Sequence, residues 1–372
     1  MKIGINARCL SSNQTGIGRY VNQLCKVINK KENDVICYLP KKIHSTFNYI
    51  DGVKYREANH HNLIQKLYWE NVLLPSKVRK DNVDVFWEPA HRLPISLIKK
   101  VPIVLTIHDL VWLKAPKTMK LKSWLAECLL TSYSIKSADI VVTTSHATKK
   151  DLEEHFPFKQ SVVQVVTPGI TSLSHQIPTS KVKKSKFTKP FFLIVGTIEP
   201  RKNHVKLLEA YANLSDETKE KAHLVIVGGK GWGGINLANH IYNLGLNNYV
   251  HYLEYIDDDN LASLYQECLF LAMPSLYEGF GMPIAEAMSF GKPILTSNIS
   301  SMPEVSQNAG LLISPDNKDE IKVALEKLIE SEHLRSRLSV YAKENAKQFC
   351  WSKSSEKLIE AFSLAINQAR TS

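Results

Sequence analysis

Residues 278–286, EGFGMPIAE, place two carboxylates eight positions apart around two glycines and a proline. The apolar run LFLAMPSLY before them has the length and composition of a buried strand, and PIAEAMSFG after them predicts a helix. Pro283 suits the first turn of that helix and Gly291 suits its C-terminal stop. We therefore expect Glu278 in the strand-to-helix loop and Glu286 in the helix.

The glycines of this loop favour a ligand that approaches the backbone closely. Gly279 and Gly281 permit such an approach, and the N–H groups around Phe280, Gly281 and Met282 would form an anion site at the helix N-terminus. Two carboxylates would repel a bare phosphate, so they more plausibly accept hydrogen bonds from neutral hydroxyls. Phosphate and polyol together indicate a nucleotide sugar. A capped core helix with incidental acidic residues is the alternative.

Two other strand ends carry residues that suit the same ligand. In TGIGRY, after the first apolar run, Gly16 and Gly18 predict a tight loop before a helix, at the end of a strand where open sheets bind ligands. In GTIEPRKN, after FFLIV, Arg201 and Lys202 lie together beyond a strand, where two cations suit a pyrophosphate. A surface turn is the alternative for the second stretch.

A polar pair, His108 and Asp109, ends the apolar run PIVLTI. Such a pair is unexpected at the end of a buried strand unless it faces a cleft, although a single histidine is more often structural. SSMPEV, with Glu304, follows another strand end at PILTS.

Two further patterns compete with this interpretation. GKGWGG at 229–234 fits GxGxxG after the strand HLVIVG, with Glu254 twenty residues beyond its last glycine, as in a dinucleotide-binding fingerprint. That fingerprint normally opens its domain, which this stretch does not. Residues 257–259 are three aspartates that contain DxD, a pattern used to hold a divalent metal. They are better explained as the N-cap and first-turn acids of a helix, so we expect no metal site there.

Length and composition bound the class of protein. A chain of 372 residues with 44% hydrophobic residues favours two domains. We expect a cytoplasmic protein, because MKIGINARCL lacks a signal-peptide pattern, no apolar run approaches a membrane span of about 20 residues, and the six cysteines form no CxxC pair.

The net charge of +11 is unevenly distributed. Residues 1–185 carry 28 basic and 14 acidic side chains, whereas residues 186–372 carry 19 and 22. A basic first half indicates an anionic partner, or simply a lysine-rich soluble surface. The sequence contains no zinc-finger, RNP or similar motif, so we expect no nucleic-acid partner.

Short apolar runs alternate with helical stretches along the chain, which is typical of doubly wound parallel sheets. The alternation stops at 171–190, a polar, lysine-rich segment with two prolines that we interpret as the interdomain connection. We expect a first domain at 1–180, a second at 181–345, and a C-terminal helix at 346–372 that returns to the first.

Taken together, TGIGRY, the HD pair, GTIEPRKN, EGFGMPIAEAM and MPEV resemble the family-four glycosyltransferases of GT-B fold. The resemblance covers essentially the whole chain. It implies an α/β protein of two Rossmann-like, doubly wound parallel-sheet domains facing across a cleft. It also implies a nucleotide-sugar donor held mainly by the second domain, retention of anomeric configuration, and no metal or other cofactor.

The same resemblance implies roles for single residues. Glu286 is expected on the donor ribose, Glu278 on a sugar hydroxyl, and His108, beside Asp109, near the reacting carbon. Arg201 and Lys202 are expected on the pyrophosphate, with the backbone of 279–282 cradling sugar and phosphate and with Gly16 and Gly18 closing over it. Many relatives have arginine directly after the glycine that corresponds to Gly196. Here that residue is Thr197, which leaves open whether Arg201 supplies the second cation.

The GTxEPRKN subgroup resembles bacterial mannosyltransferases of surface polysaccharide assembly. GDP-mannose is the leading donor and UDP-sugars are the alternative, with a glycan or lipid-linked acceptor. An NAD-dependent oxidoreductase built on GKGWGG is the alternative from another class. The stretch KAPKTMKLKSWLAECLL, residues 114–130, combines lysines with an apolar helical pattern, which predicts peripheral binding to an anionic membrane or, alternatively, an ordinary core-facing helix.

Overall fold

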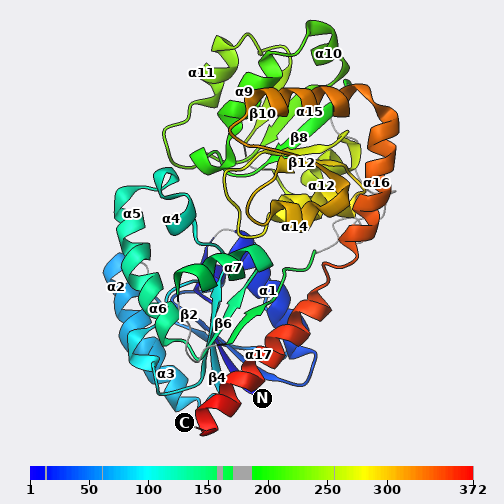
Figure 1. The fold of residues 1–372 in the computed structure, drawn as a ribbon. Coiled ribbons are helices and arrows are strands. Elements are labelled where there is room, and N and C mark those ends of the chain that lie inside the picture. Colours follow the sequence, from blue (N-terminus) through cyan, green and yellow to red (C-terminus); the bar gives the residue numbers. More distant parts are fainter. Residues whose placement is uncertain (13–14, 61, 157–161, 171–186, 255, 372) are drawn as a thin grey trace. The chain divides into compact units, whose positions relative to one another are not determined.

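The computed structural model describes residues 1–12, 15–60, 62–156, 162–170, 187–254 and 256–371 (Figure 1). The chain forms two compact units. One consists of Met1–Leu110, Lys122–Gly169 and Cys350–Ser372, and the other of Val111–Leu121 and Ile170–Phe349. The expected boundary at 180/181 and most of the expected connection at 171–190 lie outside the described residues.

In the first unit, seven described strands form a sheet in the order β3-β2-β1-β4-β5-β6-β7, and all neighbours pair in parallel. Most of these strands read as apolar runs, as expected where helices cover both faces, whereas the edge strand β3, with the sequence KYRE, is polar. In chain order they are β1 (Lys2–Asn6), β2 (Asp34–Leu39), β3 (Lys54–Glu57), β4 (Val85–Glu88), β5 (Ile103–Ile107), β6 (Ile140–Thr143) and β7 (Val162–Val165).

The helices of the first unit include two that contain a π-helical turn: α2, η2 and α3 form one continuous helix, and α5, η5 and α6 form the other. A π-turn shifts the side chains that follow it around the axis, and such turns are frequent at functional sites. The bounds are α1 (Gly16–Asn29), α2 (Leu63–Tyr68), η2 (Trp69–Leu73), α3 (Leu74–Lys80), α5 (Leu121–Ala126), η5 (Glu127–Thr131), α6 (Ser132–Ser137), α7 (His146–His155) and α17 (Trp351–Thr371). Short 3-10 turns occur at Arg8–Ser11 (η1) and Ile95–Leu97 (η3).

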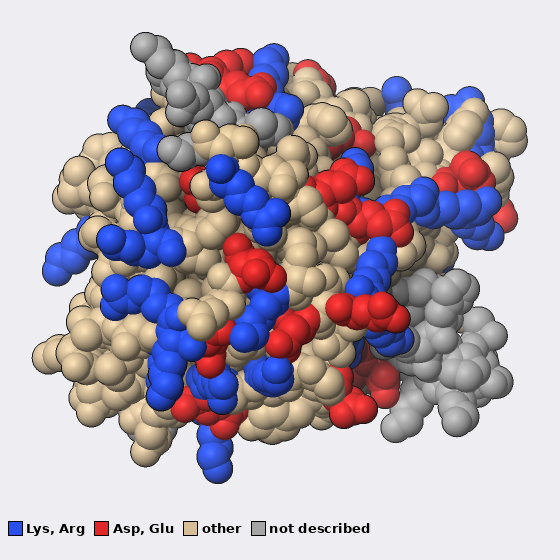
Figure 2. All heavy atoms as spheres, turned by 90° about the horizontal axis from the view of Figure 1, so that it is seen from below, with Lys and Arg blue, Asp and Glu red and all other residues tan. Residues whose placement is uncertain are grey.

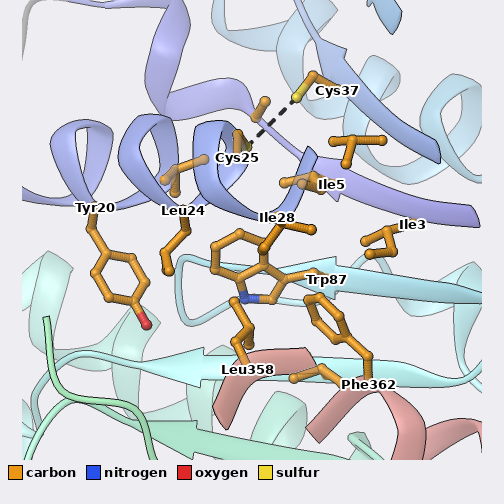
Figure 3. Close-up of a cluster of buried hydrophobic side chains, with 14 of the residues drawn as sticks. Ile3, Ile5, Tyr20, Leu24, Cys25, Ile28, Cys37, Trp87, Leu358 and Phe362 are labelled. Carbon is orange, nitrogen blue, oxygen red and sulfur yellow. Dashed lines mark hydrogen bonds between the residues drawn. The ribbon is translucent and has the colours of Figure 1, made fainter. Parts of the chain in front are cut away.

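The core of the first unit joins the two ends of the chain (Figure 3). Ile3 and Ile5 of β1 and Trp87 of β4 pack with Leu358 and Phe362 of α17, all of them buried. The C-terminal helix therefore completes this core, and the return to the first unit begins at Cys350 rather than at 346.

In the second unit, six described strands form a parallel sheet in the order β10-β9-β8-β11-β12-β13. They are β8 (Phe191–Val195), β9 (His223–Val227), β10 (Val250–Leu253), β11 (Leu271–Met273), β12 (Ile294–Ser297) and β13 (Gly310–Ile313). The helices are α4 (Val111–Lys114), α9 (His204–Ala212), α10 (Asp216–Lys221), α11 (Leu237–Asn243), α12 (Asp258–Glu267), α13 (Met282–Ser289), α14 (Met302–Ser306), α15 (Lys318–Glu330) and α16 (Glu332–Ala346). Short 3-10 turns occur at Pro116–Thr118 (η4), Pro200–Lys202 (η6) and Gln307–Ala309 (η7).

Each sheet has one point at which the direction of winding reverses. In the first sheet it lies between β1 and β4, and in the second it lies between β8 and β11. At such a point the loops after the two strands run to opposite sides and leave a crevice at the carboxyl ends, which is where open α/β sheets bind their ligands. The fold therefore predicts one crevice in each unit.

Candidate active site

The reversal point of the second sheet carries a buried carboxylate between two cations. GTIEPRKN follows β8 and EGFGM follows β11, so the two stretches meet at the reversal point. Arg201 and Lys202 each donate a hydrogen bond to Glu278, at 2.7 Å from Nη1 to Oε2 and 2.7 Å from Nζ to Oε1. The structure thus brings Glu278 into contact with two cations that lie 77 and 76 positions before it in the sequence.

These two cations decide the protonation of Glu278. The side chain is 6% exposed, and burial alone would raise its pKa. The charges of Arg201 and Lys202 outweigh burial and lower the pKa to about 2. Arg201 is also held by Glu199, whose Oε1 lies 2.6 Å from Nη2, and by the carbonyl of Tyr277. Glu278 is therefore an anion that fixes the positions of both cations.

The loop after β11 leads into a helix N-terminus as predicted. Gly281 is the N-cap of α13 with φ of 95°, a conformation that a side chain would strain, and a Cβ there would lie 3.1 Å from Cε of Met273. Pro283 occupies the first turn, and Gly291 ends the helix with φ of 68°. Ser301 donates from its hydroxyl to the carbonyls of Glu278 and Phe280 and holds the loop in place. The backbone of Gly279 to Met282 is thus held in one conformation at the N-terminus of α13.

Glu286 lies on the second turn of α13 and is 7% exposed. The hydroxyl of Tyr265, on α12, donates to its Oε2 at 2.9 Å. The two glutamates of EGFGMPIAE therefore have different surroundings: cations hold Glu278, whereas a neutral phenol holds Glu286.

The loop after β8 owes its shape to close packing with the glycine-rich stretch after β9. A Cβ on Gly228 would lie 1.9 Å from the carbonyl oxygen of Gly196, and one on Gly231 would lie 2.6 Å from that of Ile198. Gly231 is therefore needed to admit the Gly196–Ile198 backbone, as is Gly228 just before the motif, whereas nothing lies within 4 Å of a Cβ on Gly229 or Gly234. They also follow β9, away from the reversal point, which removes the main support for a dinucleotide fingerprint.

Thr197 is exposed beside this loop, and Asn203 closes it. Asn203 has φ of 60°, and its amide donates to the carbonyls of Pro274 and Pro315. It thereby ties the loop after β8 to the loop after β11. Sequence analysis did not foresee this link, although asparagine is one of the few residues that tolerate such a φ.

In the first unit, His108 directly follows β5 and is held by loop 88–92. Its Nε2–H donates to the carbonyl of Pro89 at 2.7 Å, and its backbone N–H donates to Nε2 of His91 at 2.9 Å. Burial, together with the neighbouring His91, lowers the pKa of His108 to about 4, while Asp109 opposes this change. His108 is therefore neutral at physiological pH.

The start of loop 88–92 contains a buried glutamate that sequence analysis missed. Glu88 is fully buried at the end of β4 and accepts hydrogen bonds from the amide of Asn6 at 2.6 Å and the N–H of Ala90 at 3.1 Å. Burial raises its pKa to about 7, against the effect of Arg8, whose Nη2 lies 3.5 Å away. The signal was present in DVFWEP, an acidic residue that ends an apolar run.

The two π-helical turns each direct a glutamate toward this end of the sheet. Glu70 on η2 pairs with Arg8, and Glu127 on η5 pairs with Arg92 at 2.6 Å. Both carboxylates act electrostatically on Arg8 and raise its pKa, together with Glu88 and against burial. No sequence pattern that we used predicts π-turns.

Gly16 and Gly18 occupy a different setting from the one expected. We expected both glycines in a tight loop before a helix, but α1 already begins at Gly16 with Thr15 as its N-cap. A Cβ on Gly18 would lie 2.9 Å from Cζ of Phe47, so this glycine lets the Phe47 ring pack directly on the helix backbone. Nothing lies within 4 Å of a Cβ on Gly16.

The aspartates at 257–259 cap a helix, as predicted. Asp257 is the N-cap of α12 and accepts from the N–H of Asn260, and the next two lie in the first turn. Across the described ranges, no group of three or more His, Cys, Asp or Glu is arranged to hold a metal ion. Of the helices within those ranges, none combines the length and the apolar character needed to traverse a bilayer.

Two doubly wound parallel sheets, one with a cation-carboxylate cluster at its reversal point, are the arrangement of proteins that bind phosphorylated or nucleotide-linked ligands. Comparison with known families makes this specific. Residues 14–172 match the family described as Glycosyltransferase Family 4, and residues 176–345 match Glycosyl transferases group 1. The chain belongs to the family-four glycosyltransferases of GT-B fold.

Curated relatives are similar in sequence to part or most of this chain. The O-antigen chain mannosyltransferase B of Escherichia coli is 32% identical over 62% of this chain and 62% of its own length. The serotype-specific mannosyltransferase WbdA of the same organism is 31% identical over 50% of this chain but only 23% of its own length. The chain thus spans less than two thirds of these relatives. The O-antigen chain mannosyltransferase RfbU of Salmonella typhimurium is 22% identical over 91% of this chain and 94% of its own.

Solved structures share the fold at low sequence identity. Sucrose-phosphate synthase from Thermosynechococcus elongatus superposes with a TM-score of 0.79 at 16% identity, covering 97% of this chain and 98% of that one. WaaG, a glycosyltransferase involved in lipopolysaccharide biosynthesis, gives 0.74 at 16% identity, with 96% and 98% covered. Anabaena HepE, solved with UDP and glucose, gives 0.72 at 18% identity, with 98% and 99% covered. The predicted fold class is confirmed.

Proposed function

We propose that this chain is a retaining hexosyltransferase that moves mannose from GDP-mannose to a glycan or lipid-linked acceptor in surface polysaccharide synthesis. The observation that carries the proposal is the cluster of Arg201, Lys202 and Glu278 beside the N-terminus of α13. The mannosyltransferase names of the relatives favour the sugar, and HepE with UDP makes a UDP-sugar the alternative donor.

The cluster suits the departure of a nucleoside diphosphate. When the bond between the sugar carbon and the phosphate oxygen breaks, negative charge grows on that oxygen. Fixed cations and helix N–H groups stabilise such growing charge most effectively, because they need not reorganise. In the proposed step the acceptor oxygen bonds to the sugar carbon from the face the diphosphate leaves, and the acceptor's proton passes to the departing phosphate oxygen. No metal takes part in this step.

Glu278 would have two functions in this scheme. Before the donor binds, it holds Arg201 and Lys202 in place and neutralises part of their charge. With the donor bound, a sugar hydroxyl would donate to it, while it continues to hold both cations in place for the diphosphate. The family resemblance assigns Glu286 to the ribose, which does not react.

A panel of nucleotide sugars tests the donor assignment. Thermal stabilisation and slow donor hydrolysis would be measured with GDP-mannose, UDP-glucose, UDP-galactose and NAD(H), in EDTA and again with Mg²⁺. We expect the largest response to GDP-mannose, unchanged by EDTA. A response to NAD(H) alone would favour the oxidoreductase alternative. A requirement for Mg²⁺ would favour a metal site at residues 257–259.

We further propose that the first unit binds an anionic membrane surface, where a lipid-linked acceptor would be presented. Apolar side chains are exposed on both π-containing helices: Ile64, Leu67, Tyr68 and Val72 on one, and Leu125, Leu129, Leu130 and Tyr133 on the other. Residues 63–80 also carry four basic side chains and one acidic one. Seen from below, basic side chains gather on the left half of the face, the side on which Figure 1 shows α2, α3 and α6 (Figure 2).

Apolar side chains beside basic ones match the two components of an anionic bilayer surface, its hydrocarbon and its headgroup charge. The surface is thus wider than residues 114–130, the stretch singled out by sequence. Sedimentation with vesicles of phosphatidylcholine, with and without phosphatidylglycerol, tests the proposal. We expect binding only to the anionic vesicles, weaker at high salt, and weaker for a Leu67→Ser/Leu129→Ser double variant. Equal binding to neutral vesicles would contradict it.

A further inference from the structure

Hydrogen bonds and ring contacts from several residues hold His108 in one orientation. Two of its hydrogen bonds go to one loop: Nε2–H to the carbonyl of Pro89, and the backbone N–H to Nε2 of His91. The two imidazole rings lie 5.7 Å apart at an angle of 30°, and the ring of Tyr20 meets His108 edge-on at 5.2 Å. The position and the rotation of the His108 ring are therefore both fixed.

These hydrogen bonds determine the tautomers. A carbonyl accepts only, so His108 carries its proton on Nε2, and in the neutral ring Nδ1 has the lone pair. His91 accepts at Nε2, so its own proton is on Nδ1, which faces Oε2 of Glu127 at 4.0 Å. Glu127 is held in turn by Arg92 and by the hydroxyl of Thr131. One chain of contacts thus leads from the π-turn η5 to the backbone of His108.

The unusual backbone conformation of His91 favours a functional role for this residue. Its φ of 60° is uncommon for a residue with a side chain, and such a conformation persists only where the surroundings enforce it. Its N–H donates to the carbonyl of Thr106 on β5, two residues before His108. His91 is thus hydrogen-bonded both to β5, the strand that precedes His108, and to His108 itself.

We propose that His91 is a positioning residue for His108. Through its Nε2 acceptor it holds the backbone of His108, so that the ring keeps its bond to Pro89 and directs a lone pair at Nδ1 toward a substrate hydroxyl. The proposal rests on the proposed transfer reaction and on His108 at its reaction centre, and it adds a residue to that centre. Glu127 fixes the tautomer of His91.

Three variants of His91 separate positioning from structure. His91→Gln keeps an acceptor where Nε2 lies, His91→Leu fills the space without an acceptor, and His91→Gly removes the ring while relieving the strained φ. We expect kcat to fall about 10- to 100-fold in the leucine and glycine variants, as for a small misplacement of a reacting group, and to recover in the glutamine variant. KM for the donor should change little, since the donor is held by the other unit.

His223→Leu is the matched control, because His223 is also half-buried and hydrogen-bonded to a histidine, His251, but lies in the second unit away from its reversal point. It should leave kcat unchanged. His108→Ala distinguishes the two levels of the argument. If that variant keeps full activity, the proposed reaction centre is wrong. If it is inactive while all three His91 variants match the wild type, only the positioning proposal is wrong.

A measurement without any donor completes the test. In the ¹⁵N-histidine-labelled full chain, long-range ¹H–¹⁵N spectra report which ring nitrogen is protonated. We expect the Nε2–H pattern for His108 in the wild type and in His91→Gln, and tautomer exchange in His91→Leu and His91→Gly. An unchanged, single Nε2–H pattern in all variants would overturn the proposal even if activity had changed.

Discussion

Glu88 and Glu278 are buried glutamates on the same side of the reversal point in their two sheets, yet their pKa values are shifted in opposite directions. Glu88 is the last residue of β4, and Glu278 lies in the loop that follows β11. The pKa of Glu88 is raised to about 7, mainly by burial, and that of Glu278 is lowered to about 2. Glu278 has a cation at 2.7 Å on each oxygen, whereas Glu88 has one guanidinium at 3.5 Å and Glu70 nearby.

The difference shows how two sheets with the same kind of reversal point can carry carboxyl groups of different chemistry. Burial acts on both carboxyl groups, so the number and distance of the cations decide which form is stable. In the second unit the result is a charged cluster suited to a diphosphate. In the first it is a carboxyl group with a pKa of about 7, bonded to an amide and to a backbone N–H, at the start of loop 88–92, which holds His108.

The largest expected effect is on local stability. Glu278→Gln removes the anion between two half-buried cations, and breaking a buried pair on one side typically costs about 3–5 kcal/mol. Glu88→Gln resembles the protonated acid, the form that burial favours, so at pH 7 it should cost nothing and should instead stabilise the first unit relative to the wild type. Hydrogen exchange of the β11 and β4 amides measures each unit separately. Equal costs would remove the contrast between the two carboxyl groups.

The next largest effect is expected on kcat, which should depend strongly on the cations of the second unit. Lys202→Met should lower kcat by about 10²–10³-fold, as for other groups that meet charge growing in the transition state. Lys206→Met, on the same helix-loop region but paired with Glu209 at the surface, is the control and should be silent. Steady-state kinetics with the responding donor give both values. A rise in KM with unchanged kcat would show that Lys202 only binds the ground state.

The pH dependence of stability should differ in sign at the two sites. The raised pKa of Glu88 means that the folded state keeps its proton longer, so its contribution is full below about pH 4.5 and is lost as pH rises to about 7. The lowered pKa of Glu278 means that its contribution is full above about pH 4.5 and is lost as pH falls toward 2. Each Gln variant should therefore diverge from the wild type in its own window, by up to about 3 kcal/mol for a shift of this size.

Hydrogen exchange across pH 3 to 8 measures those windows as differences between variant and wild type. Differences are needed because buried His108 and His204, each with a pKa lowered to about 4 mainly by burial, add stability that rises between pH 4 and 6.5. A Glu88→Gln variant whose difference from the wild type is flat from pH 4.5 to 7 would contradict the raised pKa.

The smallest expected effect separates the two glutamates of EGFGMPIAE. Glu286→Ala should weaken binding of free GDP about 10-fold, as for the loss of a hydrogen bond to a charged group. Glu278→Gln should leave GDP affinity unchanged or tighten it, because the two cations lose their protein anion and become available to phosphate. Calorimetry with GDP measures both. Equal losses in the two variants would mean that both carboxylates bind the nucleotide.

The sequence by itself determined the local elements. Apolar runs with turn residues between them predicted parallel sheets with helices, because a strand buried on both faces must be apolar throughout. Pro283, Gly291 and Asp257 marked helix ends correctly, since these signals are local in the chain. The motif stretches also identified the family, which the comparisons confirm. The residue roles stay predictions.

Only the tertiary structure decided which residues meet and what that does to their chemistry. Glu278 has its cations because β8 and β11 are neighbours in the sheet, a pairing across some 76 residues that no local pattern encodes. GKGWGG fits a cofactor fingerprint in the sequence, but the fold shows that this stretch follows β9, away from the reversal point, and that its Gly231 packs against the loop after β8. Glu88, His91 and the π-turns escaped sequence analysis for the same reason: protonation, tautomer and strain depend on burial and on partners, and both are fixed only when distant segments pack together.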